Sequence, residues 1–229
     1  MITLLITVIP SILILFYFIK SDKFKEPKKI IIMTFLLGVM ITVPAGYLNH
    51  YILKIFSNGD VLNDALIGGF FAGGFVEEVL KFLVLYFYIL KEKAFNEPMD
   101  AIVYGITVSL GFATLENFDY VYFHSAEYNI SSLETAIIRS ISAIPLHAVC
   151  GVMMGFYFGM YAFVSGGKNL SLALIVPYIF HGTYNFMVGL GGFYYLIVIL
   201  IAIVFSLSLH SKFKKLQDLK TDEHEDKIV

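Results

Sequence analysis

Two adjacent carboxylates, Glu77 and Glu78, lie in the middle of segment 65–90, which is otherwise almost entirely apolar. A charged side chain at the centre of a bilayer costs about 2.5–3.5 kcal/mol on insertion scales, so a pair of them predicts a function. A purely structural alternative is a buried ion pair with Lys81, one helical turn further on. One ammonium group cannot neutralise two carboxylates, however, and the pair therefore indicates acid–base or metal chemistry.

The other polar residues within apolar segments fall in three further predicted helices. Glu116 and Asn117 lie in the fourth helix and His147 lies in the fifth. His181 and Asn185 lie in the sixth with a spacing of four residues, which places them on one helix face. Together with the glutamate pair and Lys81, these are the candidate site residues, with Glu77, Glu78, Glu116 and His181 as the catalytic candidates.

The chemistry available to these groups is hydrolysis by activated water. Cys150 is the single cysteine, and no serine or threonine has a histidine or lysine at a spacing typical of a base that activates a nucleophile. Two neighbouring carboxylates in an apolar segment do not both ionise easily, so one would act as a general base and the other as an acid. His181 and Asn185 could stabilise a developing oxyanion, where one placed donor is worth about 3 kcal/mol.

A metal-dependent alternative stays open. Carboxylates and imidazoles are the ligands that a catalytic zinc ion uses to activate water. The sequence has no His-Glu-x-x-His helix, and the metal is left undecided, with zinc as the candidate. The residues that suit a zinc ion are Glu77, Glu116, His147 and His181.

The chain that must position these residues is predicted to be an all-α, polytopic membrane bundle. Of its 229 residues 58% are hydrophobic and only 15% are charged, against about 25% charged residues in a typical soluble domain. Apolar runs long enough to cross a bilayer predict about seven helices in a single integral membrane domain, with a catalytic core at 65–188 and a charged tail at 211–229. The predicted spans are 4–19, 30–52, 65–90, 99–123, 141–164, 170–188 and 193–210.

The distribution of lysines predicts the orientation of the bundle. Lysines cluster in the first, third and fifth loops and in the tail, whereas the second, fourth and sixth loops hold only Lys54. Basic loops remain in the cytoplasm. We therefore expect a multi-pass protein of the cell membrane with its N-terminus outside and its C-terminus in the cytoplasm.

This orientation gives each candidate residue a depth. With a rise of 1.5 Å per residue, Glu77 lies about 18 Å below the outer end of its helix, and Glu116, His147 and His181 each lie about 10 Å below theirs. Convergence on the outer half of the membrane predicts one site rather than four unrelated residues. Small residues repeat at helical spacing beside these positions and favour close helix packing, as in the stripe formed by Ala143, His147, Gly151, Gly155 and Gly159.

Three short motifs, in this order and on separate helices, resemble the PrsW family of bacterial membrane proteases, which is similar to the CAAX prenyl protease and bacteriocin-immunity superfamily. They are Glu77-Glu78-x-x-Lys81, Phe112-x-x-x-Glu116-Asn117 and His181-x-x-x-Asn185. The wider superfamily usually has arginine and histidine where this chain has Lys81 and Glu116, so the site here is more acidic.

The resemblance implies an intramembrane peptidase that makes the first cut, near the outer side of the membrane, in a single-span anti-sigma factor during a stress response. It implies that Glu77 and Glu78 activate water, that Glu116 and His181 share the site, and that Lys81, Asn117 and Asn185 orient or neutralise it. The expected partners are this membrane-anchored substrate and the lipid bilayer, without nucleic acid.

Two other classes of protein use similar residues. A proton- or cation-coupled transporter also has intramembrane carboxylates and histidines, but the chain has no inverted repeat and almost no acidic residues in the inner half. A non-catalytic scaffold of the same fold would tolerate Glu78→Gln, which the protease would not.

Overall fold

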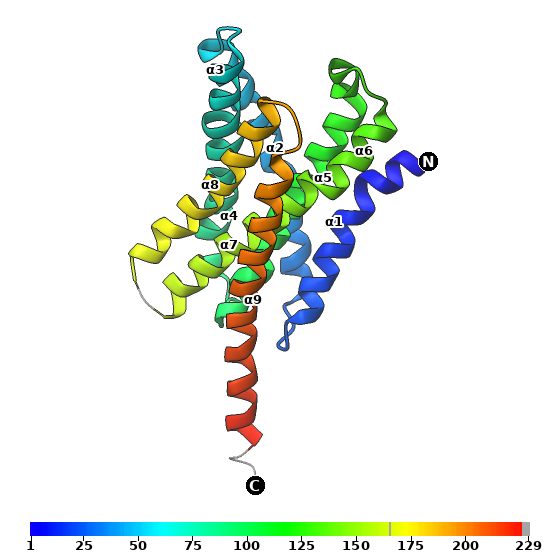
Figure 1. Ribbon diagram of the computed structural model, residues 1–229. Helices are drawn as coiled ribbons and strands as arrows, with labels where there is room; N and C mark the ends of the chain where they lie inside the picture. The colour runs from blue at the N-terminus through cyan, green and yellow to red at the C-terminus, as the bar shows by residue number, and fades with distance from the viewer. Residues whose placement is uncertain (165, 226–229) are drawn as a thin grey trace.

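The structure is a computed structural model that describes residues 1–164 and 166–225, and within these ranges it contains helices and no strand (Figure 1). Six helices are long and apolar enough to cross a membrane. The prediction of an all-helical membrane bundle is therefore confirmed. The long helices are α1 (Ile2–Ser21), α2 (Lys28–Phe56), α5 (Pro98–Asp119), α7 (Ala143–Phe163), α8 (Lys168–Gly189) and α9 (Tyr195–Glu225).

The predicted span at 65–90 is helical but changes its winding twice. It begins as α3 (Val61–Leu66), continues as a π-helix over Ile67–Glu77, and becomes α4 (Glu78–Phe87) before a short 3-10 turn at Ile89–Lys91. This interrupted segment, added to the six long helices, agrees with the expected number of about seven spans. π-Helical turns are rare and occur mostly at functional sites, and this one ends at the first residue of the glutamate pair.

Most of the connection between α5 and α7 lies outside the predicted spans, but it contains helical structure. The chain leaves α5 through a π-helical turn (Tyr120–His124) and a 3-10 turn (Ser125–Tyr128), and then forms α6 (Ser132–Ile141). A capping box starts α6, because Ser131 and Glu134 satisfy each other's backbone amides. The helix carries the only arginine of the chain, Arg139, towards the bundle.

Helices α5 and α7 form the centre of the bundle, and most of their side chains are buried. Their backbones approach closely where glycines face each other. A Cβ atom added to Gly151 would lie 2.7 Å from the carbonyl oxygen of Gly105 and 2.8 Å from the Cα of Ile106. Only glycine fits this crossing, and the small-residue stripe of the sequence thus brings α7 against α5.

We expect Gly151→Ala to destabilise the protein by about 1–3 kcal/mol, the usual cost of overpacking a well-packed interface. Gly46→Ala is the matched control, since a Cβ at this α2 position meets no atom within 4 Å; there the free energy of unfolding should stay unchanged or rise by up to about 1 kcal/mol. Thermal unfolding in detergent, followed by circular dichroism, measures both. Equal stability of the two variants would contradict the close approach.

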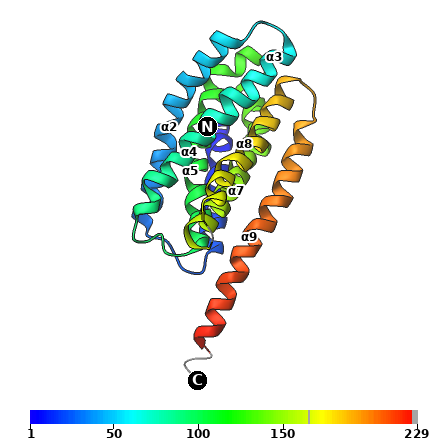
Figure 2. The ribbon, with the colours of Figure 1, turned by 90° about the vertical axis from the view of Figure 1, so that its left-hand side faces the viewer.

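Helix α9 continues past the other helices at its C-terminal end (Figures 1 and 2). The predicted tail from residue 211 is helical through Glu225. Its first turns pack on the bundle, since Phe213 is buried and its ring lies 4.5 Å from that of Phe156. Gln217 is also buried and donates to the Oδ1 of Asp22 at the end of α1, over 2.7 Å. This part of the tail is therefore packed against the bundle.

Candidate active site

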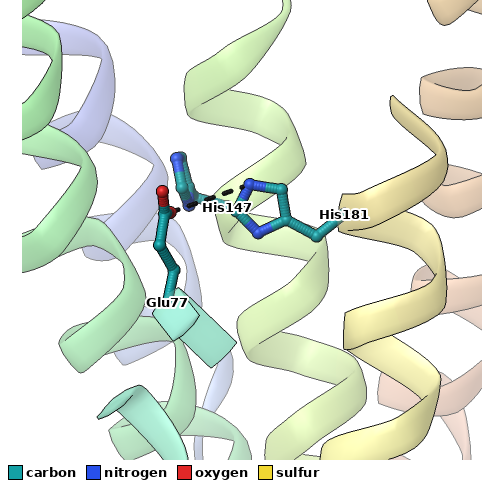
Figure 3. Close-up of side chains that lie close together, drawn as sticks. All are labelled: Glu77, His147 and His181. Carbon is teal, nitrogen blue, oxygen red and sulfur yellow. Dashed lines mark ion pairs between the residues drawn. The ribbon is translucent and has the colours of Figure 1, made fainter. Parts of the chain in front are cut away.

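The predicted catalytic residues meet at one place between four elements. Glu77 ends the π-helix, Glu78 begins α4, Glu116 extends from α5, and His181 comes from α8. His147 of α7 completes the group, and Figure 3 shows its imidazole beside Glu77 and His181. Glu77, His147 and His181 are each at most 3% exposed.

A cavity of about 380 Å³ leads to this group. Glu77 and Glu116 line it, together with both histidines, whereas Glu78 does not. The glutamate pair is thereby divided into a residue that faces the cavity and a residue that lies behind it. The cavity extends towards the end of the bundle where α2 ends and α3 begins, and its lining there includes Asn49, Leu53, Asp64, Ala65, Gly68, Val188 and Gly189.

Lys81 holds the residues behind the cavity together. Its ammonium nitrogen lies 2.7 Å from the Oε1 of Glu78 and 3.8 Å from the Oε2 of Glu77. The same nitrogen is 3.0 Å from the Nδ1 of His147, and it sits over the ring of Phe112, 4.4 Å from the centroid. A buried ammonium in this position offsets the carboxylate charge and fixes three side chains at once.

Glu78 also orients His181. The Nδ1 of His181 donates to the Oε1 of Glu78 over 2.7 Å, and its Nε2 lies 3.8 Å from the Oε2 of Glu77 (Figure 3). With the proton on Nδ1, the lone pair of Nε2 faces Glu77. A carboxylate that accepts from one imidazole nitrogen and so directs the other is the usual support of a metal-binding histidine.

Glu77 has one satisfied oxygen and one that is not. Its Oε1 accepts from the side-chain amide of Asn49 in α2 over 3.2 Å. Its Oε2 is buried and has no hydrogen-bond partner. A buried carboxylate oxygen without a partner is costly unless a further group binds it. Asn49 is not among the residues predicted from the sequence, although an amide within an apolar span was a signal that could have identified it.

Glu116 is held by Arg139, a second residue that is not among those predicted from the sequence. Arg139 of α6 donates from Nη2 to the Oε2 of Glu116 over 2.7 Å, and its guanidinium lies 3.9 Å from the ring centroid of Tyr120. The Nε2 of His147 lies 2.9 Å from the same oxygen of Glu116. Because Arg139 is the only arginine in an otherwise lysine-based chain, its residue type was the available signal.

The two asparagines of the motifs lie in different surroundings. Asn117 is fully buried, accepts from the Nε of Arg139 over 2.9 Å, and donates to the backbone carbonyl of Thr7 in α1 over 2.8 Å. Asn185 lines the cavity, next to Gly73 of the π-helix. Asn117 thus connects helices beside the site, whereas Asn185 faces the cavity.

The side chains suit a metal ion of the zinc type. Glu77, His147 and His181 each offer a ligand atom, and these atoms lie within 4.8 Å of one another. The unpartnered Oε2 of Glu77 and the Nε2 of His181 are available directly. Each nitrogen of His147 already has a partner, so its binding to a metal requires release of Glu116 or Lys81.

A second set of possible ligands, Glu78, Cys150 and His181, fits less well. Lys81 already occupies an oxygen of Glu78, and Cys150 donates its thiol proton to the carbonyl oxygen of Pro177 over 3.7 Å. The set of Glu77, His147 and His181 has two histidines and one carboxylate, as catalytic zinc sites often do.

Comparison with known proteins gives a consistent result. The family described as "PrsW family intramembrane metalloprotease" matches residues 26–208. "Protease PrsW" of Bacillus subtilis (strain 168) is 36% identical over 182 residues, which cover 78% of each chain. "Protease PrsW" of Oceanobacillus iheyensis is 30% identical over 88% of this chain and 90% of the relative. That of Clostridioides difficile (strain 630) is 30% identical over 87% and 84%. No solved structure matches the chain.

Proposed function

Because this chain belongs to the PrsW family of intramembrane metalloproteases, we propose that it hydrolyses a peptide bond of a membrane-anchored protein with water activated in the cavity between α2, α5, α7 and α8. It is a peptidase and a multi-pass membrane protein. The observation that carries the proposed site is the buried, unpartnered Oε2 of Glu77, which faces the Nε2 of His181 at the base of the cavity.

In this proposal Glu77 and His181 would hold a catalytic metal ion of the zinc type. His147 would be the third ligand through Nδ1 once this nitrogen is released by Lys81, while its Nε2 keeps its proton and continues to donate to Glu116. Such a metal, when bound, would supply Lewis acidity for water and for the scissile carbonyl. Glu78 keeps the proton of His181 on Nδ1, and Lys81 compensates the charge of Glu78. Glu78 and Lys81 are therefore positioning residues.

Glu116 is the proposed general base. It lines the cavity, and because Arg139 and His147 both bond to its Oε2, its Oε1 is left to accept a proton from the attacking water. The same carboxyl then delivers the proton to the leaving amine. The side chain of Asn185 lines the cavity next to Gly73 of the π-helix, and in this proposal its amide donates a hydrogen bond to the oxyanion.

The proposed substrate is a single-span membrane protein, and in particular an anti-sigma factor whose first cleavage starts a stress response. The motifs of the family support this class of substrate. The lysine distribution supports an N-terminus outside the cell, and the cavity then extends from Glu77 towards the outer surface. A cut near the outer side of the membrane follows from that direction.

The test is cleavage of a tagged single-span anti-sigma factor by the purified protein in liposomes, before and after removal of metal with a zinc chelator. We expect the chelator to abolish cleavage and stoichiometric zinc to restore it. The metal content of the protein, measured by mass spectrometry, should fall and recover in parallel. Glu127→Gln, which changes a carboxylate with a side chain 66% exposed, is the control and should behave as wild type.

Full cleavage by metal-free protein would overturn the metal-dependent mechanism and favour water activated by glutamate and histidine alone. Absence of cleavage in every sample, with normal insertion and normal metal content, would contradict the proposed substrate class instead. The two outcomes are distinguishable because metal content is measured independently of cleavage.

A further inference from the structure

A second group of carboxylates lies at the N-terminal end of α2, whereas the active site lies near Asn49 at the other end of this helix. Asp22 follows α1, Glu26 precedes α2, and Asp100 lies in the first turn of α5. Each of the three offers a carboxylate oxygen, and these oxygens lie within 4.8 Å of one another. Two acidic side chains of the α1–α2 connection and one of α5 therefore converge on a single point.

Two of these carboxylates are buried and incompletely bonded. Asp22 is 2% exposed and Asp100 is 0% exposed. Asp22 uses Oδ1 to accept from Gln217, over 2.7 Å, and its Oδ2 has no partner. Asp100 uses Oδ2 to accept from the backbone amides before α5, over 2.8 and 2.9 Å, and its Oδ1 has no partner. One oxygen of each side chain is left over for a further ligand.

No basic side chain within the described ranges compensates these charges. Among residues 1–164 and 166–219, whose ion pairs are described, no lysine, arginine or histidine nitrogen lies within 4.0 Å of the carboxylates of Asp22, Glu26 or Asp100. The ammonium of Lys25 donates to backbone carbonyls at the end of α1, two of them at 3.0 Å. Buried charges without an opposite charge are strongly unfavourable.

The carboxylates also oppose one another's ionisation. Burial, followed by the nearby charges of Asp22 and Glu97, raises the pKa of Glu26 above its ordinary value. A proton shared between Glu26 and Asp100, whose carboxylate oxygens lie within 4.8 Å of each other, would relieve that pair. Such a shared proton would leave the unpartnered oxygen of Asp22 without a ligand. A cation at the point where the three carboxylates converge would instead bind all three side chains.

We propose that Asp22, Glu26 and Asp100 bind one hard divalent cation, Mg²⁺ or Ca²⁺, at a site separate from the active site. The donor set consists of oxygen atoms alone, which suits these ions and not zinc. The cation joins the α1–α2 connection to the start of α5. Because Gln217 bonds to Asp22, it also supports the part of α9 that is packed against the bundle.

The chain offers a direct optical probe of this site. It contains no tryptophan, and the hydroxyl of Tyr104 donates a hydrogen bond to Glu26. Tb³⁺ replaces Ca²⁺ at carboxylate sites and emits when a nearby tyrosine is excited. We expect purified full-length protein, first treated with chelator, to show tyrosine-sensitised Tb³⁺ emission that Ca²⁺ or Mg²⁺ displaces.

Three variants make the test specific. Glu26→Gln should weaken cation binding by at least about ten-fold, because one of three charged ligands is lost. Tyr104→Phe should reduce the emission and leave the amount of bound cation, measured by equilibrium dialysis, as in wild type. Glu77→Gln, which alters the active site only, should retain both the emission and the binding.

Thermal unfolding provides a second readout that does not depend on luminescence. A ligand that binds only the folded state raises the unfolding temperature, so Ca²⁺ or Mg²⁺ should stabilise wild type and Glu77→Gln but not Glu26→Gln or Asp22→Asn. Absence of a bound cation in wild type, or equal binding by wild type and Glu26→Gln, would overturn the proposal. Loss of the signal in Glu77→Gln would also overturn it, since the cation would then belong to the active site.

Discussion

Glu77→Gln is expected to abolish both proteolysis and the binding of zinc in the active site, whereas Glu78→Gln should leave a measurable share of both. Glu77 faces the cavity with an unpartnered oxygen, and an amide replaces its charge by a weaker ligand. Glu78 acts through His181 and Lys81. The loss of such supporting contacts costs about 10–100-fold in metal affinity or activity, and the loss of the ligand itself should exceed that range.

The measurement is the initial rate of cleavage in liposomes together with zinc content at a series of free zinc concentrations. Excess zinc should partly restore Glu78→Gln, because its ligands remain, but it should not restore Glu77→Gln. Asp119→Asn, a change at a side chain 51% exposed near the end of α5, serves as the control. If Glu78→Gln loses the metal completely and Glu77→Gln retains it, the assignment of the two residues is reversed.

Arg139→Gln is expected to reduce the turnover number by about 10²-fold with little change in KM, because displacement of a reacting group by about 1 Å can cost this much. The guanidinium holds Glu116 through Nη2 and stacks on Tyr120. Loss of this contact leaves the proposed base without its fixed position. Arg139→Lys keeps the charge without the planar fork and should give an intermediate rate.

A double-mutant cycle separates positioning from a general loss of stability. If Arg139 acts through Glu116, the variant that combines Glu116→Gln with Arg139→Gln should be no slower than Glu116→Gln alone. Additive losses would mean that Arg139 contributes independently, for example by holding α6 through Asn117. Circular dichroism of all three variants checks that the helices are retained.

The sequence was enough to predict that the candidate site residues lie at a similar depth, because helices in a membrane are rigid rods. Lysine positions gave the direction of each helix, and the rise per residue gave the depths of Glu77, Glu116, His147 and His181. The structure brings these four residues together. No knowledge of tertiary contacts was needed for this part.

The details that depend on rotation and on irregular segments could not be predicted in the same way. Adjacent residues of a helix point in different directions, and only the structure shows that Glu77 faces the cavity while Glu78 lies behind it. Helix α6 is amphipathic and short, so hydropathy did not reveal it, and Arg139 was therefore not placed beside Glu116. The carboxylates at the other end of α2 come from two segments far apart in the sequence, with no local motif.

The π-helical winding of Ile67–Glu77 makes the number of residues in this segment as important as their identity. A π-turn holds more residues than an α-turn, so the segment is longer than regular helix geometry requires for its height. Loss of one residue would let it rewind as an ordinary helix and would rotate Glu77 away from His181 while every side chain remained. An insertion or deletion within this segment would therefore separate the two residues even if the glycines that pack against α8, Gly69 and Gly74, were kept.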